Sequence, residues 1–298
     1  MPDFLLALNV ILLVVMLVQA IVTVVLARRY HRRQEWLAPD HEPTTPSVTV
    51  IVPAFNEQAT IANALAGLSR QTYPHLDVLV VDDGSTDGTS EVAQAVADSL
   101  DGPVHITVTR KGNGGKASAL NYGLLMTNAD IIVCVDADSI LMPNAIQRIV
   151  EPFADPSVGA VGGFVKVANT KTVLGRHQAM EYISGLALQR AAFAELDAIQ
   201  VLSGALSAFR RDSLRKVLYS RDTVVEDFDV TIAMHAKGDR VVMHPDAIAY
   251  TEGPLSLKDL QKQRYRWTYG RFQVLGKYRE SLFTPDLGSL SRVVLPYA

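Results

Sequence analysis

Short apolar runs alternate with segments of helical periodicity between residues 48 and 135. Each run has the length of a strand, and each intervening segment is long enough for a helix. This alternation predicts a parallel sheet with both faces covered by helices. Beyond residue 159 the pattern changes to longer helical stretches. The expected strands are 48–52, 78–81, 105–109 and 131–135, and the expected helices are 59–68, 89–97, 117–126, 172–193 and 257–275.

Two of the expected strands end in acidic residues. Asp82 and Asp83 end the second strand, and Asp136 and Asp138 end the fourth. Ligands of open α/β sheets bind at the carboxyl ends of the strands, so both pairs are expected at the ligand edge. Two adjacent carboxylates repel each other unless a cation or a proton lies between them. One such pair is typical of helix caps or turns, but two pairs on one edge, beside the segment VPAFNE that ends the first strand, indicate a binding site.

The segment RKGNGGKASAL allows a different interpretation. It fits the pattern G-x-G-x-x-A from Gly112, after a strand and before a helix, and Asp136 follows at about the spacing of a ribose-binding acid. A dinucleotide-binding oxidoreductase is therefore the alternative from a different class. Against it, the fingerprint belongs after the first strand of such a unit, whereas this segment follows the third. We expect instead a turn whose amides, with Lys111 and Lys116, approach a diphosphate.

Residues 4–27 are almost entirely apolar. As a helix they would rise about 36 Å, enough to cross a hydrocarbon core of roughly 30 Å. The positive charge follows the run, at Arg28, Arg29, Arg32 and Arg33, whereas a secretory signal carries it before the run. We therefore expect a transmembrane anchor in the cell (inner) membrane. The positive-inside rule places its N-terminus outside and the domain that follows in the cytoplasm.

Net charge and cysteine content argue against a nucleic-acid-binding protein and against a disulfide-rich one. The formal net charge of −3 at pH 7 gives no reason to expect a nucleic-acid partner. Cys134 is the only cysteine, which excludes a disulfide framework and fits a reducing compartment. Hydrophobic residues make up 48% of the 298 residues, enough for a substantial core.

Two later segments complete an ordered set of motifs: TVVEDFDVT at 223–231 and QRYRW at 263–267. With VPAFNE and the two acid pairs before them, the chain resembles the membrane-bound processive members of glycosyltransferase family 2, the synthases of cellulose, chitin, hyaluronan and poly-β-1,6-N-acetylglucosamine. The similarity runs from about Val48 to the C-terminus. Within the family, TVLGRHQAMEYISGLALQRA followed by VLSGALSAFRRDSL is most similar to the poly-N-acetylglucosamine synthases. The resemblance implies an α/β fold of the GT-A type, with one N-terminal transmembrane helix and C-terminal interfacial helices.

The resemblance assigns roles to individual residues. Asp136 and Asp138 stand at its DxD motif, so Asp136 is expected to orient the sugar and Asp138 to bind Mg²⁺ or Mn²⁺. Asp227 stands where the family has the acid of Thr-Glu-Asp, and the resemblance implies that it is the catalytic base. Val225 replaces the family's threonine, which removes a hydroxyl and leaves the acid in place. The other expected substrate-binding residues are Pro53, Phe55, Glu57 and either Asp82 or Asp83 around uridine, Lys116 near the diphosphate, and Gln263, Arg266 and Trp267 of the QxxRW motif beside acceptor and pyrophosphate.

The chemistry of sugar transfer needs these residue types. Charge builds on the diphosphate as the glycosidic bond breaks, and a hard divalent cation can neutralise it. The acceptor hydroxyl must lose its proton, which requires a positioned base. Asp227 is the preferred candidate, and Glu226 and Asp229 are the local alternatives. A single in-line displacement would invert the anomeric carbon and give a β-linked product from an α-linked donor.

The expected partners are a UDP-sugar donor, a polysaccharide acceptor and the lipid membrane. N-acetylglucosamine is the preferred sugar, and a UDP-glucose-using β-glucan synthase or a non-processive transferase is the alternative within the family. The family continues past the segment SRVVLPYA into further membrane helices, so either a fragment of a longer protein or partner subunits that supply such helices are expected. Alone, the chain is expected to make little long exported polymer. The expected divisions are an anchor at 1–33, a linker at 34–47, the GT-A domain at 48–255 and the QxxRW helical region at 256–298.

Overall fold

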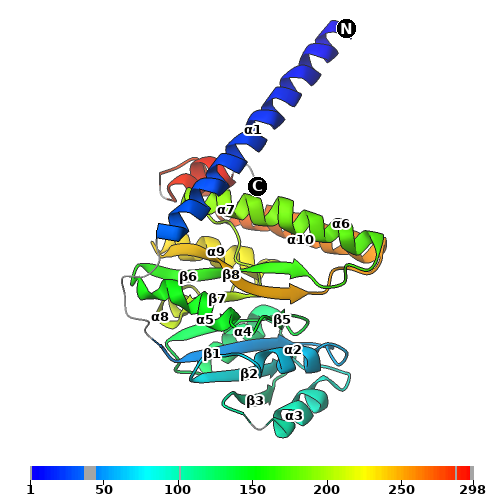
Figure 1. Cartoon of the computed structure of the whole chain (residues 1–298), viewed down its shortest axis with the longest axis vertical. Helices are drawn as coiled ribbons and strands as arrows, with labels where there is room; N and C mark the ends of the chain where they lie inside the picture. The colour runs from blue at the N-terminus through cyan, green and yellow to red at the C-terminus, as the bar shows by residue number, and fades with distance from the viewer. Residues whose placement is uncertain (1, 37–44, 101, 286, 296–298) are drawn as a thin grey trace.

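The computed structural model describes residues 2–36, 45–100, 102–285 and 287–295. An eight-stranded sheet lies at the centre, in the order β3-β2-β1-β4-β7-β6-β8-β5. Helices cover both faces of the sheet, and α1 projects away from the body (Figure 1). The strands are β1 Val48–Ala54, β2 Leu76–Asp82, β3 His105–Arg110, β4 Ile131–Cys134, β5 Ile140–Leu141, β6 Val158–Val167, β7 Ser207–Arg210 and β8 Arg240–Thr251. The helices are α1 Pro2–Trp36, α2 Ile61–Leu68, α3 Thr89–Ser99, α4 Lys116–Leu125, α5 Ala145–Val150, α6 Val173–Glu181, α7 Leu188–Glu195, α8 Arg211–Val217, α9 Glu226–Ala236 and α10 Leu257–Lys277.

The first half of the sheet is parallel, as the alternation of strands and helices predicts. β1 pairs in parallel with both β2 and β4, and β2 pairs in parallel with β3. Successive side chains of β1 enter different cores, because neighbouring residues of a strand point to opposite faces. Val50 and Val52 pack with Leu65 of α2, whereas Ile51 packs with Leu120 of α4 on the other face. The expectation of two covered faces is therefore confirmed.

The expectation that the chain beyond residue 159 is mainly helical is wrong. β6, β7 and β8 extend the sheet, and the complete sheet is mixed, since β7 pairs antiparallel with β4 and β6. β5 also pairs antiparallel with β8, while β6 and β8 are parallel. These strands give weak sequence signals because β6 contains three glycines, β7 has only four residues and β8 contains Pro245.

α1 contains the segment Phe4–Arg32, which is long and apolar enough to cross a membrane, and its apolar side chains are mostly exposed. The C-terminal end of this helix is held by the body. Ala27 is buried with Ala191 of α7, and Arg29 Nε lies 3.2 Å from Glu195 Oε1. The helix continues to Trp36 and so includes the first residues of the expected linker, while residues 37–44 lie outside the described part of the chain.

α6 and α10 lie side by side over the body (Figure 1). Each begins at a hydroxyl side chain that accepts a backbone hydrogen bond, Thr172 for α6 and Ser256 for α10. The two helices are joined by Arg264 Nη2 and Glu181 Oε2, which are 2.6 Å apart. A π-helical turn, Tyr182–Ala187, connects α6 to α7. This arrangement holds the QRYRW segment of α10 above the carboxyl edge of the sheet.

Candidate active site

A cavity of about 150 Å³ opens where β4 ends, beside the start of α9 and the first half of α10. We call it the edge cavity. It brings together segments that are far apart in the sequence. Of the residues expected to bind substrate, metal or proton, those that line it are Lys116, Asp136, Asp138, Asp227, Gln263, Arg266 and Trp267.

Lys116 links two acidic segments in the wall of the edge cavity. Its Nζ lies 2.6 Å from Asp136 Oδ1 and 3.0 Å from Glu226 Oε1. Burial alone would lower the pKa of Lys116, but these carboxylates hold the pKa well above its ordinary value. Burial would raise the pKa of Glu226, but the Lys116 ammonium holds it below its ordinary value. Lys116 is therefore a fixed positive charge, and Glu226 is ionised beside it.

Asp138, unlike Asp136 and Glu226, lines the edge cavity without a basic partner among the described residues. Its Oδ1 accepts hydrogen bonds from the hydroxyls of Ser139 at 3.1 Å and Thr251 at 3.4 Å. In the described part of the chain, no lysine or arginine nitrogen lies within 4.0 Å of it. Burial, and then the charges of Asp136 and Glu57, raise the pKa of Asp138 to about 6. The ionised form of Asp138 is therefore disfavoured, and a cation beside it would stabilise that form.

The donor atoms at Asp138 fit a divalent cation that is shared with a substrate. Among the described residues, no group of three or more His, Cys, Asp or Glu side chains could hold a metal by itself. Mg²⁺ is usually bound by one or two carboxylates together with phosphate oxygens and water. One free carboxylate facing a cavity therefore suits Mg²⁺ or Mn²⁺ that binds with a diphosphate.

Asp227 lies in the first turn of α9, where the helix N-terminus favours a negative charge. Its carboxylate accepts a hydrogen bond from the Phe228 amide at 2.8 Å. Burial, and then the neighbouring Glu226, raise the pKa of Asp227 to about 6. A carboxylate with this pKa can accept a proton near neutral pH better than an ordinary aspartate.

The alternative bases are less suitable than Asp227. Glu226 is paired with Lys116, and its lowered pKa makes it a weaker base. Asp229 is 1% exposed and points into the body. Its carboxylate accepts hydrogen bonds from Lys277 Nζ at 2.8 Å and Tyr278 Oη at 2.9 Å, which attach the end of α10 to α9. Glu226 therefore orients Lys116, and Asp229 stabilises the packing of the two helices.

The QxxRW residues enter the edge cavity from α10. Gln263 Oε1 is buried and has no hydrogen-bond partner among the described residues, so it is available to a ligand donor. Trp267 is held by Arg264, whose guanidinium carbon lies 4.4 Å from the centre of the ring. Arg266 also lines the cavity and contributes a planar fork of donors suited to phosphate oxygens.

Val225, which replaces the family's threonine, packs against α10. A Cβ at Gly270 would lie 2.5 Å from both Cγ atoms of Val225, so this close approach of helix and loop requires glycine at residue 270. Val225 is buried and contributes to the core beneath α10. The departure from the family pattern therefore replaces a hydroxyl with apolar packing at the junction that positions Asp227.

The acid pair of the second strand is turned inward. Asp82 is fully buried and accepts hydrogen bonds from the Ser85 amide at 2.9 Å and the Ser90 hydroxyl at 2.5 Å. Asp83 accepts hydrogen bonds from the amides of Gly114 at 3.1 Å and Gly115 at 2.6 Å. Both carboxylates therefore hold loops together.

The loop after β3 differs from our expectation. We expected its amides and Lys111 to approach a diphosphate, but Lys111 Nζ lies 2.5 Å from Asp83 Oδ1, and the Gly114 and Gly115 amides bind the same carboxylate. Gly115 has φ of +85°, a conformation that favours glycine. Lys116 alone of this segment's basic residues lines the edge cavity.

Removing the Asp83 carboxylate should cost stability before it costs donor binding. Asp83→Ala removes the acceptor of two loop amides and one of the two acceptors of Lys111, and we expect a loss of about 1–3 kcal/mol in the free energy of unfolding. Urea denaturation measures this loss, with the exposed Asp77→Ala on β2 as the control. An unchanged stability together with a large loss of UDP affinity would instead make Asp83 a direct uridine contact.

Three residues near the end of β1 were expected to contact uridine: Pro53 lies in the strand, and Phe55 and Glu57 follow it. Pro53 is buried and lines a small cavity with Lys116 and Asp136. Phe55 is 47% exposed. Glu57 accepts a hydrogen bond from the Thr60 hydroxyl at 2.6 Å and is close enough to raise the pKa of Asp138.

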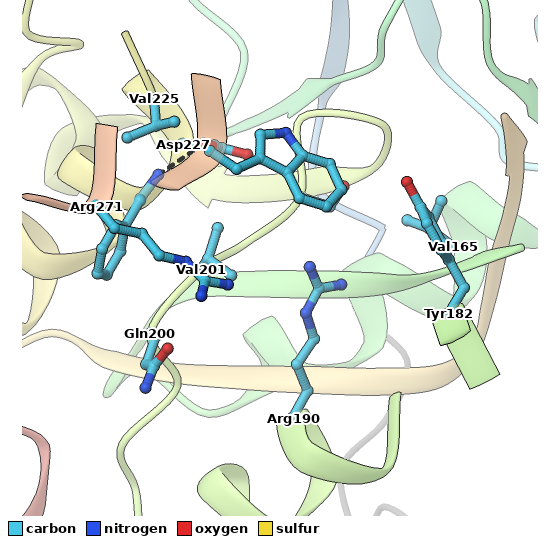
Figure 2. Close-up of a pocket in the computed structure, with 11 residues that line it drawn as sticks. Val165, Tyr182, Arg190, Gln200, Val201, Val225, Asp227 and Arg271 are labelled. Atoms are coloured by element: carbon cyan, nitrogen blue, oxygen red, sulfur yellow. Dashed lines mark hydrogen bonds between the residues drawn. The ribbon is translucent and has the colours of Figure 1, made fainter. Parts of the chain in front are cut away.

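A second cavity, of about 100 Å³, lies on the other side of Asp227. We call it the arginine cavity, because Arg190 and Arg271 both line it. Figure 2 shows Arg190 rising from α7 and Arg271 reaching in from α10, with Asp227 at the opposite wall. Neither arginine was expected from the sequence, because no local motif marks them and only the fold brings them together.

Comparison with known proteins places the chain in a family. A family model described as Glycosyltransferase like family 2 matches residues 46–270. The chain belongs to glycosyltransferase family 2. The matched residues include the whole lining of the edge cavity. The expected glycosyltransferase class is thus confirmed, and the alternative of a dinucleotide-binding oxidoreductase is wrong.

Curated members of glycosyltransferase family 2 include similar synthases. The chain is 31% identical over 230 residues to the poly-β-1,6-N-acetyl-D-glucosamine synthase of Staphylococcus aureus (strain COL), covering 76% of this chain and 55% of that protein. It is 29% identical to the synthase of the same name from Staphylococcus epidermidis, with the same coverage of 76% and 55%. The chain therefore spans about half the length of these curated relatives.

Solved structures confirm the GT-A type fold. A mannosyltransferase from Pyrobaculum calidifontis, in complex with GDP-Man and Mn²⁺, superposes with a TM-score of 0.71 at 26% identity, covering 93% of this chain and 83% of that chain. A glucosyl-3-phosphoglycerate synthase from Mycobacterium tuberculosis, solved with Mn²⁺ and UDP, superposes with a TM-score of 0.55 at 22% identity, covering 78% of each chain. The second likeness shows the fold alone.

Proposed function

We propose that this glycosyltransferase moves N-acetylglucosamine from UDP-N-acetylglucosamine to a β-linked polysaccharide, with inversion and with a divalent metal. The observation that carries the proposal is the edge cavity, where the acids after β4 face Asp227 and the QxxRW residues of α10. The similarity to the two staphylococcal synthases supports the choice of sugar.

In this proposal the donor diphosphate lies between β4 and α10. Asp138 holds the Mg²⁺ or Mn²⁺ that, when bound, neutralises part of the charge on the leaving diphosphate. Arg266 adds a second, permanent cation. Asp136, fixed by Lys116, orients the sugar hydroxyls, and the face of Trp267 offers an apolar surface for a sugar ring.

The reaction needs one displacement at the anomeric carbon. Asp227 removes the proton of the acceptor hydroxyl, whose oxygen forms a bond to that carbon from the side opposite the diphosphate. The bond to the diphosphate breaks, and its electron pair leaves with UDP. An α-linked donor therefore gives a β-linked product. Asp227 lines both cavities, which suits a base located between donor and acceptor.

The rate of transfer should depend on the protonation of Asp227. Its pKa of about 6 lies above the ordinary value, so the carboxylate becomes protonated, and unable to accept a proton, as the pH falls through about 6. We expect kcat/KM at saturating Mn²⁺ to be flat above about pH 7 and to fall about tenfold per pH unit below about pH 5.5. Calorimetry of UDP binding over the same range separates this effect from loss of the donor. A rate that stays flat down to about pH 5 would argue against Asp227 as the base.

Release of UDP from a panel of nucleotide sugars tests the donor. UDP-N-acetylglucosamine is expected to be turned over fastest by the purified chain with Mn²⁺. Preference for UDP-glucose would support a β-glucan synthase instead. GDP-mannose belongs in the panel because the Pyrobaculum structure contains it. Release from none of these donors would contradict the proposed function.

We also propose the membrane arrangement given by the sequence. α1 crosses the cell membrane with its N-terminus outside, since Arg28, Arg29 and Arg32 follow the apolar segment. α10 and α6 then lie at the cytoplasmic surface of the bilayer, which suits the exposed side chains of Met180 and Phe272, each 70% exposed. Vesicles treated with protease test this orientation. The domain that follows α1 should be digested in inside-out vesicles and protected in right-side-out vesicles.

The proposed divisions of the chain follow the same argument. Residues 48–255 form the catalytic domain, and 256–298 form an interfacial region that positions the QxxRW motif. The polysaccharide acceptor would reach the site from the membrane side, where α7 meets the end of α1. Export of a long product would require further membrane helices, from a longer chain or from partner subunits, because a single helix cannot enclose a polar path.

A further inference from the structure

The edge cavity and the arginine cavity are two sides of one site. Asp227 and Trp267 line both of them. On the side of the edge cavity lie the acids of β4 and Lys116, which suit a metal and a diphosphate. The arginine cavity lies beyond Asp227, on the side that the proposed displacement assigns to the acceptor. The side chains that line the arginine cavity are therefore expected to contact the acceptor rather than the donor.

Arg190 lines the arginine cavity without a partner for its charge among the side chains that the structure describes. Its Nε is buried and has no hydrogen-bond partner in the described part of the chain. No carboxylate oxygen lies within 4.0 Å of its nitrogens among the described residues. Burial lowers the pKa of Arg190, while the charge of Asp227 acts in the opposite direction. The Arg190 side chain is partly buried, and a guanidinium N–H that is buried without an acceptor is costly, so an anion in the cavity would offset that cost.

Arg271 and Gln200 add further donors to the same cavity. Arg271 belongs to α10, one turn beyond Trp267, and also has no carboxylate within 4.0 Å among the residues that the structure describes. Figure 2 shows the two arginine side chains pointing toward the same space, with Gln200 beside it. Asp227 is the only carboxylate residue in the lining of this cavity. A neutral sugar would offer no ion pair to the partly buried Arg190 or to Arg271, whose side chain is exposed to solvent.

We propose that the arginine cavity is an acceptor subsite for an anionic group, a phosphate or a carboxylate, carried by the sugar acceptor beside the hydroxyl that attacks. This inference rests on the proposed function and deepens it. The planar forks of Arg190 and Arg271 suit the bidentate binding of such groups. The anion takes no part in the bond changes: the hydroxyl oxygen of the acceptor joins the anomeric carbon, UDP leaves with the electron pair, and the proton passes to Asp227.

The test compares acceptors that differ only in charge. Octyl β-glucoside is the neutral probe, octyl β-glucuronide carries a carboxylate, and octyl β-glucoside 6-phosphate carries a phosphate. Their affinity for the full chain is measured by calorimetry with UDP and Mn²⁺ present, and transfer of labelled sugar from UDP-N-acetylglucosamine is measured in parallel. We expect one or both anionic probes to bind about 10- to 100-fold more tightly than the neutral probe. The anionic probe that binds more tightly identifies the group as the carboxylate of a sugar acid or the phosphate of a sugar phosphate.

Charge-removing variants assign the effect to the cavity. Arg190→Gln and Arg271→Gln should each lower the affinity for the anionic probe by about 10-fold or more while leaving the neutral probe unchanged. Arg176→Gln, which removes the same charge from the exposed face of α6, is the matched control. Arg190→Lys should recover part of the affinity, because it restores the charge but not the fork.

Three outcomes separate this inference from the proposed function. Equal affinity of the unmutated chain for charged and neutral probes would overturn the anionic subsite, whatever the donor. Loss of UDP affinity in Arg190→Gln, with no change for the acceptor probes, would also overturn it and make Arg190 a positioning residue for Asp227. Anion-selective binding without UDP release from UDP-N-acetylglucosamine would support the subsite and contradict the proposed donor.

Discussion

The Asp227→Asn variant is expected to bind UDP with nearly unchanged affinity and to transfer sugar about 10²–10⁴-fold more slowly. Asparagine keeps the shape of the side chain and can still accept the hydrogen bond of the Phe228 amide, but it cannot take a proton. The loss should therefore appear in kcat and not in donor binding. Single-turnover transfer and calorimetry with UDP measure the two quantities separately.

Two neighbouring substitutions serve as controls for Asp227. Glu226→Gln weakens the hold on Lys116 and should affect donor binding more than the rate constant. Asp229→Asn weakens the bonds from Lys277 and Tyr278 and should lower the free energy of unfolding by about 1–3 kcal/mol. If Asp227→Asn keeps the unmutated rate and Glu226→Gln loses it, the proton acceptor is Glu226.

Asp138→Ala should abolish the dependence of UDP binding on Mg²⁺ or Mn²⁺ and lower transfer by about 10²-fold or more, because several kcal/mol of charge stabilisation are lost. Two of the neighbouring carboxylates already have partners of their own. Asp136 is paired with Lys116, and Glu57 accepts a hydrogen bond from Thr60. Calorimetry of UDP binding with and without metal makes the measurement.

The control for Asp138→Ala is Asp77→Ala, which removes an exposed acid from the start of β2. It should retain both UDP affinity and its dependence on metal. Equal UDP affinity of the unmutated protein with and without metal would show that Asp138 does not bind the cation together with the diphosphate.

Sequence reasoning succeeds where the signal is local. β1, β2 and β4 each appear as an apolar run and β3 as a short alternating segment, so their parallel arrangement and the acids that end β2 and β4 can be predicted. Asp136 and Asp138 are two residues apart and follow such a run directly. The later motifs could be assigned only through the resemblance to a family, since nothing local places QRYRW above the end of β4.

The remaining features depend on contacts between distant residues. Asp83 and Asp138 both follow a strand in the sequence. In the fold, however, the Asp83 carboxylate is bound by loop amides and by Lys111. β6 is missed because glycines that admit close packing also weaken its strand pattern; a Cβ at Gly163 would lie 2.5 Å from Leu206 Cδ2. Arg190 and Arg271 lie on different helices, so their shared cavity exists only in the folded chain.

The most direct test is diffraction from crystals of the chain grown with UDP-N-acetylglucosamine and Mn²⁺, using the anomalous signal of the metal. Our account predicts one anomalous peak in the edge cavity, next to the Asp138 carboxylate and the bound diphosphate. The anomeric carbon should then face Asp227. A diphosphate bound at the loop after β3, or a metal that contacts neither Asp138 nor the diphosphate, would contradict the account.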